Sequence, residues 1–385
     1  MKIIYFDNAA TTQVDGEVAR AMSQFFSEKY GNPSSLHSLG RESREAIENS
    51  RKKIAEFLNC GPEEIIFTSG GTESNNLAIK GIALASNKKH IITSKIEHPA
   101  VLETCRELER RGDKVDYISV DKEGIVSLEE LKKKINSETM LVSVMHVNNE
   151  IGTIQPIEEI GKICKEKKVL FHTDAVQGFG KIKIDVKKMN IDLLSASGHK
   201  INAPKGIGFL YVRKGIKIKP VLNGGGQEKG LRSGTENVPG IVAFGKACEI
   251  AGKRIKNKEE AKIEKLRDRL ISEILKIPGT RLNGSREKRI FNNVNVSFEN
   301  IEGEALLLLL DKEGICASTG SACSSHSLEP SHVLKAIGLS DLQAHGSLRL
   351  TLGFNNNEKE IDYTLEKIKE AVEKLRKISQ NIKIN

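Results

Sequence analysis

The pattern that most constrains this chain is an alternation of short apolar segments and longer amphipathic ones between residues 64 and 214. Short runs rich in Val, Ile and Leu predict strands, and apolar residues that recur every three or four positions predict helices. Strands without polar alternation must be covered on both faces, which favours a mostly parallel sheet between helices. The expected strands are 64–68, 91–94, 115–120, 140–147, 169–173, 193–196 and 208–212, with helices at 72–85, 98–110 and 156–167.

The pattern changes near residue 252. A charged helix is expected at 253–275, with an apolar stripe of Ile263, Leu266, Leu270 and Ile274, followed by a strand at 293–298 and helices at 302–311 and 361–378. We therefore expect an α/β protein with two domains. Residues 15–252 would form a large domain, and residues 1–14 and 253–385 a smaller α+β domain that carries a cysteine loop at about 316–332.

Composition excludes some functions. Hydrophobic residues make up 38% of the 385 residues, which is enough for a core and argues against disorder. Trp is absent and aromatic residues are 4%, so direct nucleic-acid binding on stacked aromatic rings is not expected. The formal charge is +9, with Lys and Glu interleaved. A solvated charged surface is the preferred explanation, and an acidic protein or a nucleic acid is the alternative partner.

The six cysteines are scattered, without a Cys-x-x-Cys pair, which is typical of a reducing compartment. No apolar run approaches the roughly 20 residues that span a bilayer. We therefore expect a cytoplasmic protein that does not enter a membrane.

Two glycines follow the first expected strand, in Thr68-Ser69-Gly70-Gly71-Thr72. A glycine turn at the start of a helix lets backbone N–H groups approach a phosphate, and the helix N-terminus adds positive potential. Gly71 and Thr72 are therefore candidate phosphate ligands. An ordinary helix start capped by Thr72 or Ser74 is the alternative.

Two later strands end in reactive side chains. Asp174 ends one of them, with Gln177 three residues on, and Ser197, His199 and Lys200 follow the other. Open α/β sheets bind ligands at this carboxyl edge. A carboxylate there can pair with a protonated ring nitrogen, and a partly desolvated lysine can form a Schiff base. For each residue alone, a helix cap or a surface position is the alternative.

The segment around Cys323 is rich in Gly, Ser and Ala, which predicts a mobile loop with a thiol that can attack as a thiolate. Cys316, in an apolar run, is expected to be buried and inert. A zinc site of Cys316, Cys323, His326 and His332 is an alternative, although the spacing matches no common zinc pattern.

Two further residues are candidates. His98 lies at a strand-to-helix junction, where its ring could stack on an aromatic ring, shuttle protons or cap the helix. Arg349 lies between apolar residues of an apparent strand, where a guanidinium can bind a carboxylate through two parallel hydrogen bonds or face the solvent.

In combination these motifs resemble the cysteine desulfurases of the IscS/NifS family. Ser-Gly-His-Lys at 197–200 and Thr-Gly-Ser-Ala-Cys at 319–323 are the most specific motifs. The likeness also includes 5–12, 30–35, 148–152 and 232–237, and it extends to the last helix. The long loop through 327–332 resembles the housekeeping group. The resemblance implies the pyridoxal-phosphate-dependent transferase fold type I, with a mostly parallel central sheet.

The resemblance also implies the role of each candidate toward pyridoxal 5′-phosphate. Lys200 would bind the cofactor as a Schiff base, Asp174 would pair with the ring nitrogen, and Gln177 would contact the ring hydroxyl. His98 would stack on the ring and take part in catalysis. The remaining ligands would be Gly71, Thr72, Ser197 and His199 for the phosphate, Thr235 for the phosphate of a neighbouring subunit in a homodimer, and Asn149 and Arg349 for the substrate carboxylate.

The implied reaction converts L-cysteine to L-alanine and leaves the sulfur on Cys323 as a persulfide. An iron–sulfur scaffold protein would accept the sulfur, with tRNA-thiolation proteins as further partners, and Cys323 could also ligate a cluster shared with the scaffold. The alternatives are a selenocysteine lyase, an aminotransferase, or a non-enzymatic sulfur- or cluster-assembly protein. Three departures from the family pattern are present: Asn202-Ala203 replaces Tyr-Gly or His-Gly, Phe354 replaces Arg, and His146 replaces a small residue.

Overall fold

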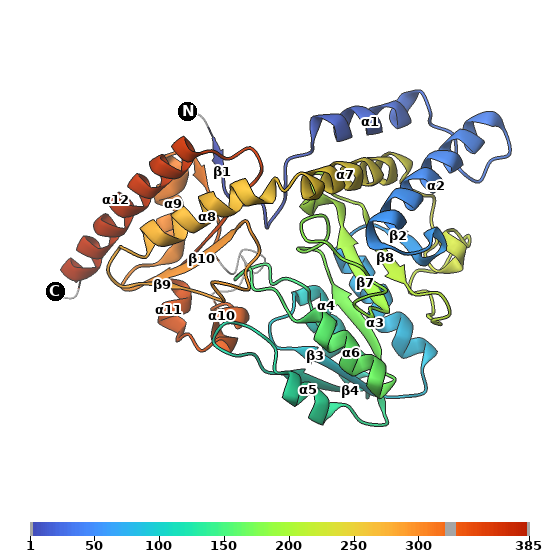
Figure 1. Ribbon diagram of the computed structural model, residues 1–385, viewed down its shortest axis with the longest axis horizontal. Coiled ribbons are helices and arrows are strands. Elements are labelled where there is room, and N and C mark those ends of the chain that lie inside the picture. Colours follow the sequence, from blue (N-terminus) through green and yellow to red (C-terminus); the bar gives the residue numbers. More distant parts are fainter. Residues whose placement is uncertain (1–2, 320–328, 383–385) are drawn as a thin grey trace.

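The computed structural model describes residues 3–319 and 329–382. A large sheet with helices on both faces fills one half of the molecule, and two small sheets with three long helices fill the other (Figure 1). The segment after β1 (Ile4–Tyr5) runs from the second half to α1 (Gly16–Ser27) in the first. No helix in the described part of the chain is long and apolar enough to cross a membrane.

The large sheet has seven strands in the order β2-β8-β7-β6-β5-β3-β4, and every strand except β8 runs in the same direction. The prediction of a mostly parallel sheet is confirmed. Its strands are β2 (Ile65–Thr68), β3 (His90–Ser94), β4 (Lys114–Ile118), β5 (Thr139–Ser143), β6 (Leu170–Asp174), β7 (Leu193–Ser197) and β8 (Gly208–Val212).

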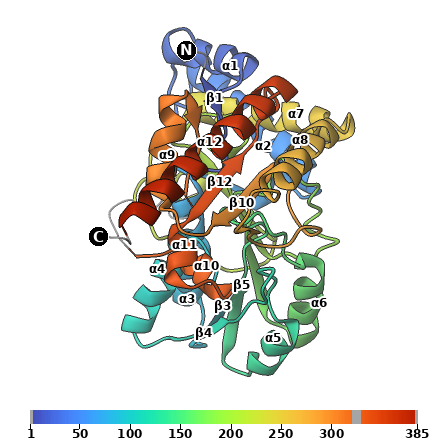
Figure 2. The ribbon, with the colours of Figure 1, turned by 90° about the vertical axis from the view of Figure 1, so that its left-hand side faces the viewer.

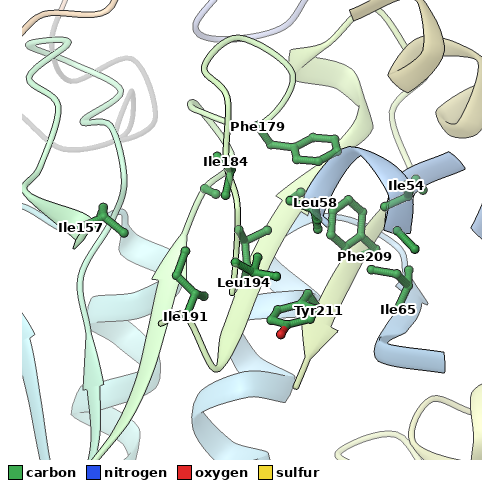
Figure 3. Packing of buried hydrophobic residues seen from close by; sticks show 14 of the residues in the cluster. Ile54, Leu58, Ile65, Ile157, Phe179, Ile184, Ile191, Leu194, Phe209 and Tyr211 are labelled. Atoms are coloured by element: carbon green, nitrogen blue, oxygen red, sulfur yellow. The ribbon is translucent and has the colours of Figure 1, made fainter. Parts of the chain in front are cut away.

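Strand residues alternate between two apolar cores, because successive side chains point to opposite faces of a sheet. Phe209 and Tyr211 pack toward one core, and Leu210 and Val212 toward the other. Figure 3 shows Ile54 and Leu58 of a covering helix facing Phe209 in the first core. This face is covered by α1, α2 (Ser38–Leu58), α5 (Leu128–Lys134), α6 (Ile157–Lys167) and α7 (Val238–Lys256), and the other by α3 (Gly71–Ala85) and α4 (Pro99–Arg110).

The second half contains an antiparallel sheet in the order β12-β10-β9 and the parallel pair β1-β11. Figure 2 shows α9 and α12 lying over β10 and β12. These helices and α8 share one apolar core with the sheet. The elements are α8 (Glu260–Ile274), β9 (Thr280–Leu282), β10 (Asn293–Phe298), α9 (Gly303–Lys312), β11 (Ile315–Cys316), α10 (His332–Ala336), α11 (Asp341–His345), β12 (Ser347–Thr351) and α12 (Glu358–Ile382).

The prediction of one continuous helix at 253–275 is wrong. Helix α7 ends at Lys256 and α8 begins at Glu260, because Lys258 adopts a left-handed conformation with φ of 56°. The expected stripe of Ile263, Leu266, Leu270 and Ile274 is buried, so the pattern was read correctly and only the break was missed. The division of the chain into domains at residues 14 and 252 stays a prediction.

Four phenylalanine rings stabilise the core of the large sheet. Phe179 lies 5.0 Å from the rings of Phe57 and Phe209 and 5.9 Å from that of Phe244, measured between centroids. Phe179→Ala should lower the free energy of unfolding by about 3–5 kcal/mol, because it leaves a cavity among these rings. Phe26→Ala, at a 64% exposed residue, should change it by less than about 0.5 kcal/mol. Denaturant unfolding of both variants measures the difference, and equal losses would contradict the packing described.

Candidate active site

The candidate residues lie at one edge of the large sheet. Strands β2, β7, β6, β5 and β3 all point their carboxyl ends to this edge, and each is followed within six residues by a candidate. The sheet therefore gathers side chains that are far apart in the sequence, as expected for an open α/β fold. In the order of the strands above, the residues that follow are Gly71, Lys200, Gln177, Asn149 and His98.

Helix α3 starts without a side-chain cap, so the expectation that Thr72 or Ser74 caps it is wrong. Its N-cap is Gly70, and Ser74 instead donates to the Phe209 carbonyl at 2.9 Å. A Cβ atom on Gly71 would lie 3.7 Å from that of Ser197, so the end of β7 packs close to the start of the helix. The backbone N–H groups at the start of α3 are thus available to a phosphate-sized anion without a side-chain competitor.

The exposed loop that carries Thr235 is tied to the same helix start. Arg232 donates from Nε to Glu73 Oε1 at 2.9 Å, and Glu73 also accepts from the backbone N–H of Ser69. This ion pair neutralises the one acidic side chain in the first turn of α3. Thr235 itself is exposed.

Asp174 is buried at the end of β6, with 5% of its surface exposed. Its Oδ1 accepts from the Val176 N–H at 2.9 Å and its Oδ2 from Asn75 Nδ2 at 2.7 Å. Both oxygens are thus held in place by donors, which suits a carboxylate that binds a protonated ring nitrogen. Sequence reasoning missed Asn75; its position one helical turn after Gly71 was the available signal.

Lys200 lies in a single 3₁₀ turn, Gly198–Lys200, directly after β7. Its Nζ donates to the carbonyl oxygens of Ala9 and Ala10, each at 2.5 Å. Gln177 donates from Nε2 to the Ala9 carbonyl at 2.9 Å. The N-terminal segment therefore lies against the candidate Schiff-base lysine, a contact that the sequence analysis did not anticipate.

Both candidate histidines have a lowered pKa. His98 caps α4, because its Nδ1 accepts from the Ala100 N–H at 3.1 Å, and burial lowers its pKa even though Asp174 opposes this effect. Burial, reinforced by Lys200 and other nearby lysines, lowers the pKa of His199 to about 4. A neutral His98 presents its ring face for stacking, and His199 shares a hydrogen bond of 3.2 Å with Thr11 Oγ1.

Arg349 is buried in β12, so the alternative of a solvent-facing residue is wrong. Its Nη2 donates to Asp7 Oδ1 at 2.9 Å and its Nη1 to the Asn149 carbonyl at 3.0 Å. Its Nε is buried and has no hydrogen-bond partner among the described residues. Arg349 thus lies beside Asn149, as the resemblance implied, and its guanidinium has an N–H left for an anion.

Cys323, His326 and the centre of the cysteine loop lie outside the described residues, so the zinc alternative is not tested on them. Among the described residues, no group of three His, Cys, Asp or Glu side chains is placed to hold a metal ion. Cys316 is only partly buried, which corrects the expectation of a fully buried thiol; burial raises its pKa, with Asp311 and Asp7 adding to the effect.

The departures from the family pattern meet at one arginine. Arg254 of α7 donates from Nη1 to Asn202 Oδ1 at 3.0 Å, and its guanidinium carbon lies 4.5 Å from the centre of the Phe354 ring. It also pairs with Asp15 at 3.3 Å. The positive charge near Phe354 therefore comes from Arg254 of α7 and not from residue 354 itself. The turn after Lys200 is held by the side-chain amide of Asn202.

The residues at this edge fit pyridoxal phosphate. The uncapped start of α3 suits the phosphate, the doubly held Asp174 suits the ring nitrogen, and Lys200 suits the aldehyde carbon. Asn75 adds a buried Oδ1 without a hydrogen-bond partner among the described residues, which marks a polar site. These features define the class of the protein, an α/β enzyme whose lysine, buried carboxylate and helix start fit an aldehyde cofactor.

Comparison with known proteins narrows this class. Residues 4–364 match the family model "Aminotransferase class-V". The chain is 57% identical over 380 residues to the cysteine desulfurase IscS of Methanosarcina thermophila, covering 98% of this chain and 94% of the relative. It is 53% identical to the IscS of Dictyoglomus turgidum, covering 99% of this chain and 98% of that protein. A solved NifS-like protein superposes with a TM-score of 0.91 at 45% identity, covering 97% of this chain and 100% of that chain. The chain therefore belongs to the cysteine desulfurase group, IscS/NifS, of the class-V aminotransferase family.

Gly180 allows the turn after β6 to pack against the turn of Lys200. It has φ of 73°, and a Cβ atom there would lie 2.6 Å from Ile201 Cγ2. Gly180→Ala should lower the free energy of unfolding by about 2–4 kcal/mol, from left-handed strain plus overpacking, and should reduce retention of the cofactor.

Gly215→Ala is the matched control for this prediction. Gly215 has φ of 94° and no atom within 4 Å of an added Cβ, so only the backbone strain of about 1–2 kcal/mol applies. Thermal unfolding and pyridoxal phosphate content compare the two variants. An equal effect of both would show that the contact with Ile201 is unimportant.

Proposed function

We propose that this protein is a pyridoxal-phosphate-dependent cysteine desulfurase that converts L-cysteine to L-alanine and transfers the sulfur to Cys323. One observation carries the proposal: the amine of Lys200 and the buried carboxylate of Asp174 follow neighbouring parallel strands, beside an uncapped helix start. The relatives named above, which carry the same activity in their names over nearly the full length, support it. No comparison favours a selenocysteine lyase, an amino-transfer reaction or a non-enzymatic role.

Each residue has a task that its surroundings allow. Bound pyridoxal phosphate supplies an electron-withdrawing ring, which acidifies the Cα proton of an attached amino acid. Lys200 Nζ holds the cofactor between turnovers and, when released, accepts the proton from Cα. Asp174 would hold the proton on the ring nitrogen, and His98, whose pKa is lowered by burial, would stack on the ring. Arg349 and Asn149 orient the carboxylate of the substrate.

The sulfur step needs a nucleophile from this chain. The thiolate of Cys323 attacks the sulfur of the substrate; an S–S bond forms and the Cβ–S bond breaks, with the electron pair returning to the substrate carbon. Protonation of that carbon completes alanine. One cysteine and one thiol thus give one alanine and one persulfide, so no external oxidant or reductant is needed.

The ends of the cysteine loop are anchored beside the site. Before the loop, Ser318 and Arg349 exchange two backbone hydrogen bonds, and after it Ser331 Oγ donates to Glu150 Oε2 at 2.5 Å. His332 Nε2 bonds the Glu97 carbonyl at 2.9 Å, next to His98.

The acceptor and the assembly are part of the proposal. We propose a homodimer in which Thr235 on its exposed loop completes the phosphate site of the neighbouring subunit, and an iron–sulfur scaffold protein that accepts the sulfur. Proteins of tRNA thiolation are a second class of acceptor. A cytoplasmic location fits these partners, and Cys323 could ligate a nascent cluster during transfer.

The test is incubation of the purified protein with pyridoxal phosphate and L-cysteine, followed by mass spectrometry. We expect alanine and a mass increase of one sulfur atom on Cys323. Cys323→Ala should lower alanine formation at least about 100-fold, whereas Cys316→Ala should retain it. Lys200→Ala should abolish the yellow colour of the bound cofactor. Continued alanine release by Cys323→Ala would defeat the role given to this thiol.

Recognition of the carboxylate is tested separately. Arg349→Lys should raise KM for L-cysteine by about 10-fold or more with a smaller change in kcat, because an ammonium cannot match the planar geometry of the guanidinium. Asp7→Asn is the control, since it removes the ion pair between Asp7 and Arg349 but leaves the Arg349 side chain in place. A larger effect of Asp7→Asn on KM would indicate that Arg349 has only a structural role.

A further inference from the structure

A second lysine, Lys181, lies beside Lys200 and has no role in the function described above. Its Nζ donates to Gln177 Oε1 at 3.1 Å. Gln177 links Lys181 to Lys200, because its Nε2 donates to the Ala9 carbonyl that also accepts from Lys200 Nζ. Two lysine ammonium groups are thus connected through one amide and one backbone carbonyl.

The position of Lys181 follows from the backbone. Gly180, in a left-handed conformation, packs against Ile201, which is adjacent to Lys200 in the chain. Lys181 and Lys200 both line a cavity of about 880 Å³ between the N-terminal segment, α7 and the turn after β12. Both lysines therefore line the same partly open cavity, where electrostatic interactions are stronger than in bulk water.

The charged groups around this space do not neutralise Lys181. Lys205 and Arg254 add positive charge to the cavity, and the two carboxylates, Asp15 and Glu360, bond to Arg254 and Asn356 respectively. No carboxylate among the described residues forms an ion pair with Lys181. Burial and the charge of Lys200 lower the pKa of Lys181 to about 7, and Lys181 in turn contributes to the lowered pKa of His199.

We propose that Lys181 is a positioning residue for Lys200: it fixes the amide of Gln177 with its N–H groups toward the Ala9 carbonyl and, in its protonated form, adds a positive charge that favours the unprotonated state of the Lys200 nitrogen. An unprotonated amine is the form that attacks an aldehyde and removes a proton from carbon. The hydrogen bond to Oε1 decides the orientation of the Gln177 amide, which could otherwise flip. The inference rests on the proposed function, since it concerns the nitrogen that would bind pyridoxal phosphate.

The experiment measures the visible absorbance of the holoenzyme against pH, which reports protonation of the nitrogen that links Lys200 to the cofactor. Lys181→Gln and Lys181→Met remove the charge of residue 181. The pH at which half of the linking nitrogen is protonated, the midpoint, should therefore rise by about one unit, which is a ten-fold change in proton affinity. Lys181→Arg keeps a charge and a donor and should stay near the wild-type midpoint. Lys183→Gln, at an exposed lysine two residues on, removes the same formal charge and should leave the midpoint unchanged.

The outcomes separate this inference from the proposed function. A wild-type protein that takes up no pyridoxal phosphate would overturn both. A loaded, folded Lys181→Gln or Lys181→Met with the wild-type midpoint would overturn the role of Lys181 alone. If both fail to fold while Lys181→Arg folds, Lys181 is a structural residue and the proposal is wrong. An equal shift in Lys183→Gln would attribute the effect to net charge and not to this contact.

Discussion

The site depends on one segment of backbone, residues 4–12, which connects the two halves of the molecule. Its first residues pair with β11, and its carbonyl groups at Ala9 and Ala10 accept from Lys200 and Gln177. Asp7 at its centre pairs with the buried Arg349. A buried backbone carbonyl must find a donor, and here the donors are the residues of the site. The same contacts that satisfy the segment therefore set the distance between Lys200, from the large sheet, and Arg349, from the small one.

Much of this arrangement can be predicted from the sequence. Short apolar runs give strands with little ambiguity of position, and the carboxyl end of a parallel strand is a strong guide to the site, which is why Asp174, Ser197 and Lys200 were found. Contacts between distant residues carry no periodic signal. Asn75 on Asp174, Ala9 on Lys200 and the break at Lys258 depend on tertiary packing and a single left-handed residue, so the sequence pattern could not predict them.

The exchange around Arg254 shows how a family pattern can change without loss of a charge. The resemblance implies Tyr-Gly or His-Gly after the lysine turn and an arginine after β12, whereas this chain has Asn202-Ala203 and Phe354. The guanidinium of Arg254 reaches both, bonding the amide and lying over the ring. Because Asn202 adopts φ of 66°, a conformation that asparagine tolerates better than bulky residues do, the smaller side chain also suits the turn. Asn202 and Phe354 thus share one partner, the guanidinium of Arg254.

The positive net charge can be separated into two parts on physical grounds. On the helices, many lysines and arginines face a glutamate three or four residues away, as in Glu103–Arg106 and Glu107–Arg111, and such pairs contribute little beyond solubility. At the carboxyl edge, Lys181 and Lys200 lie together beside the neutral His199, and no carboxylate among the described residues forms an ion pair with Lys181. A phosphate and an amino-acid carboxylate are the anions that such an edge would attract. The charge of these two lysines is therefore a property of the site, whereas the surface pairs contribute no net charge.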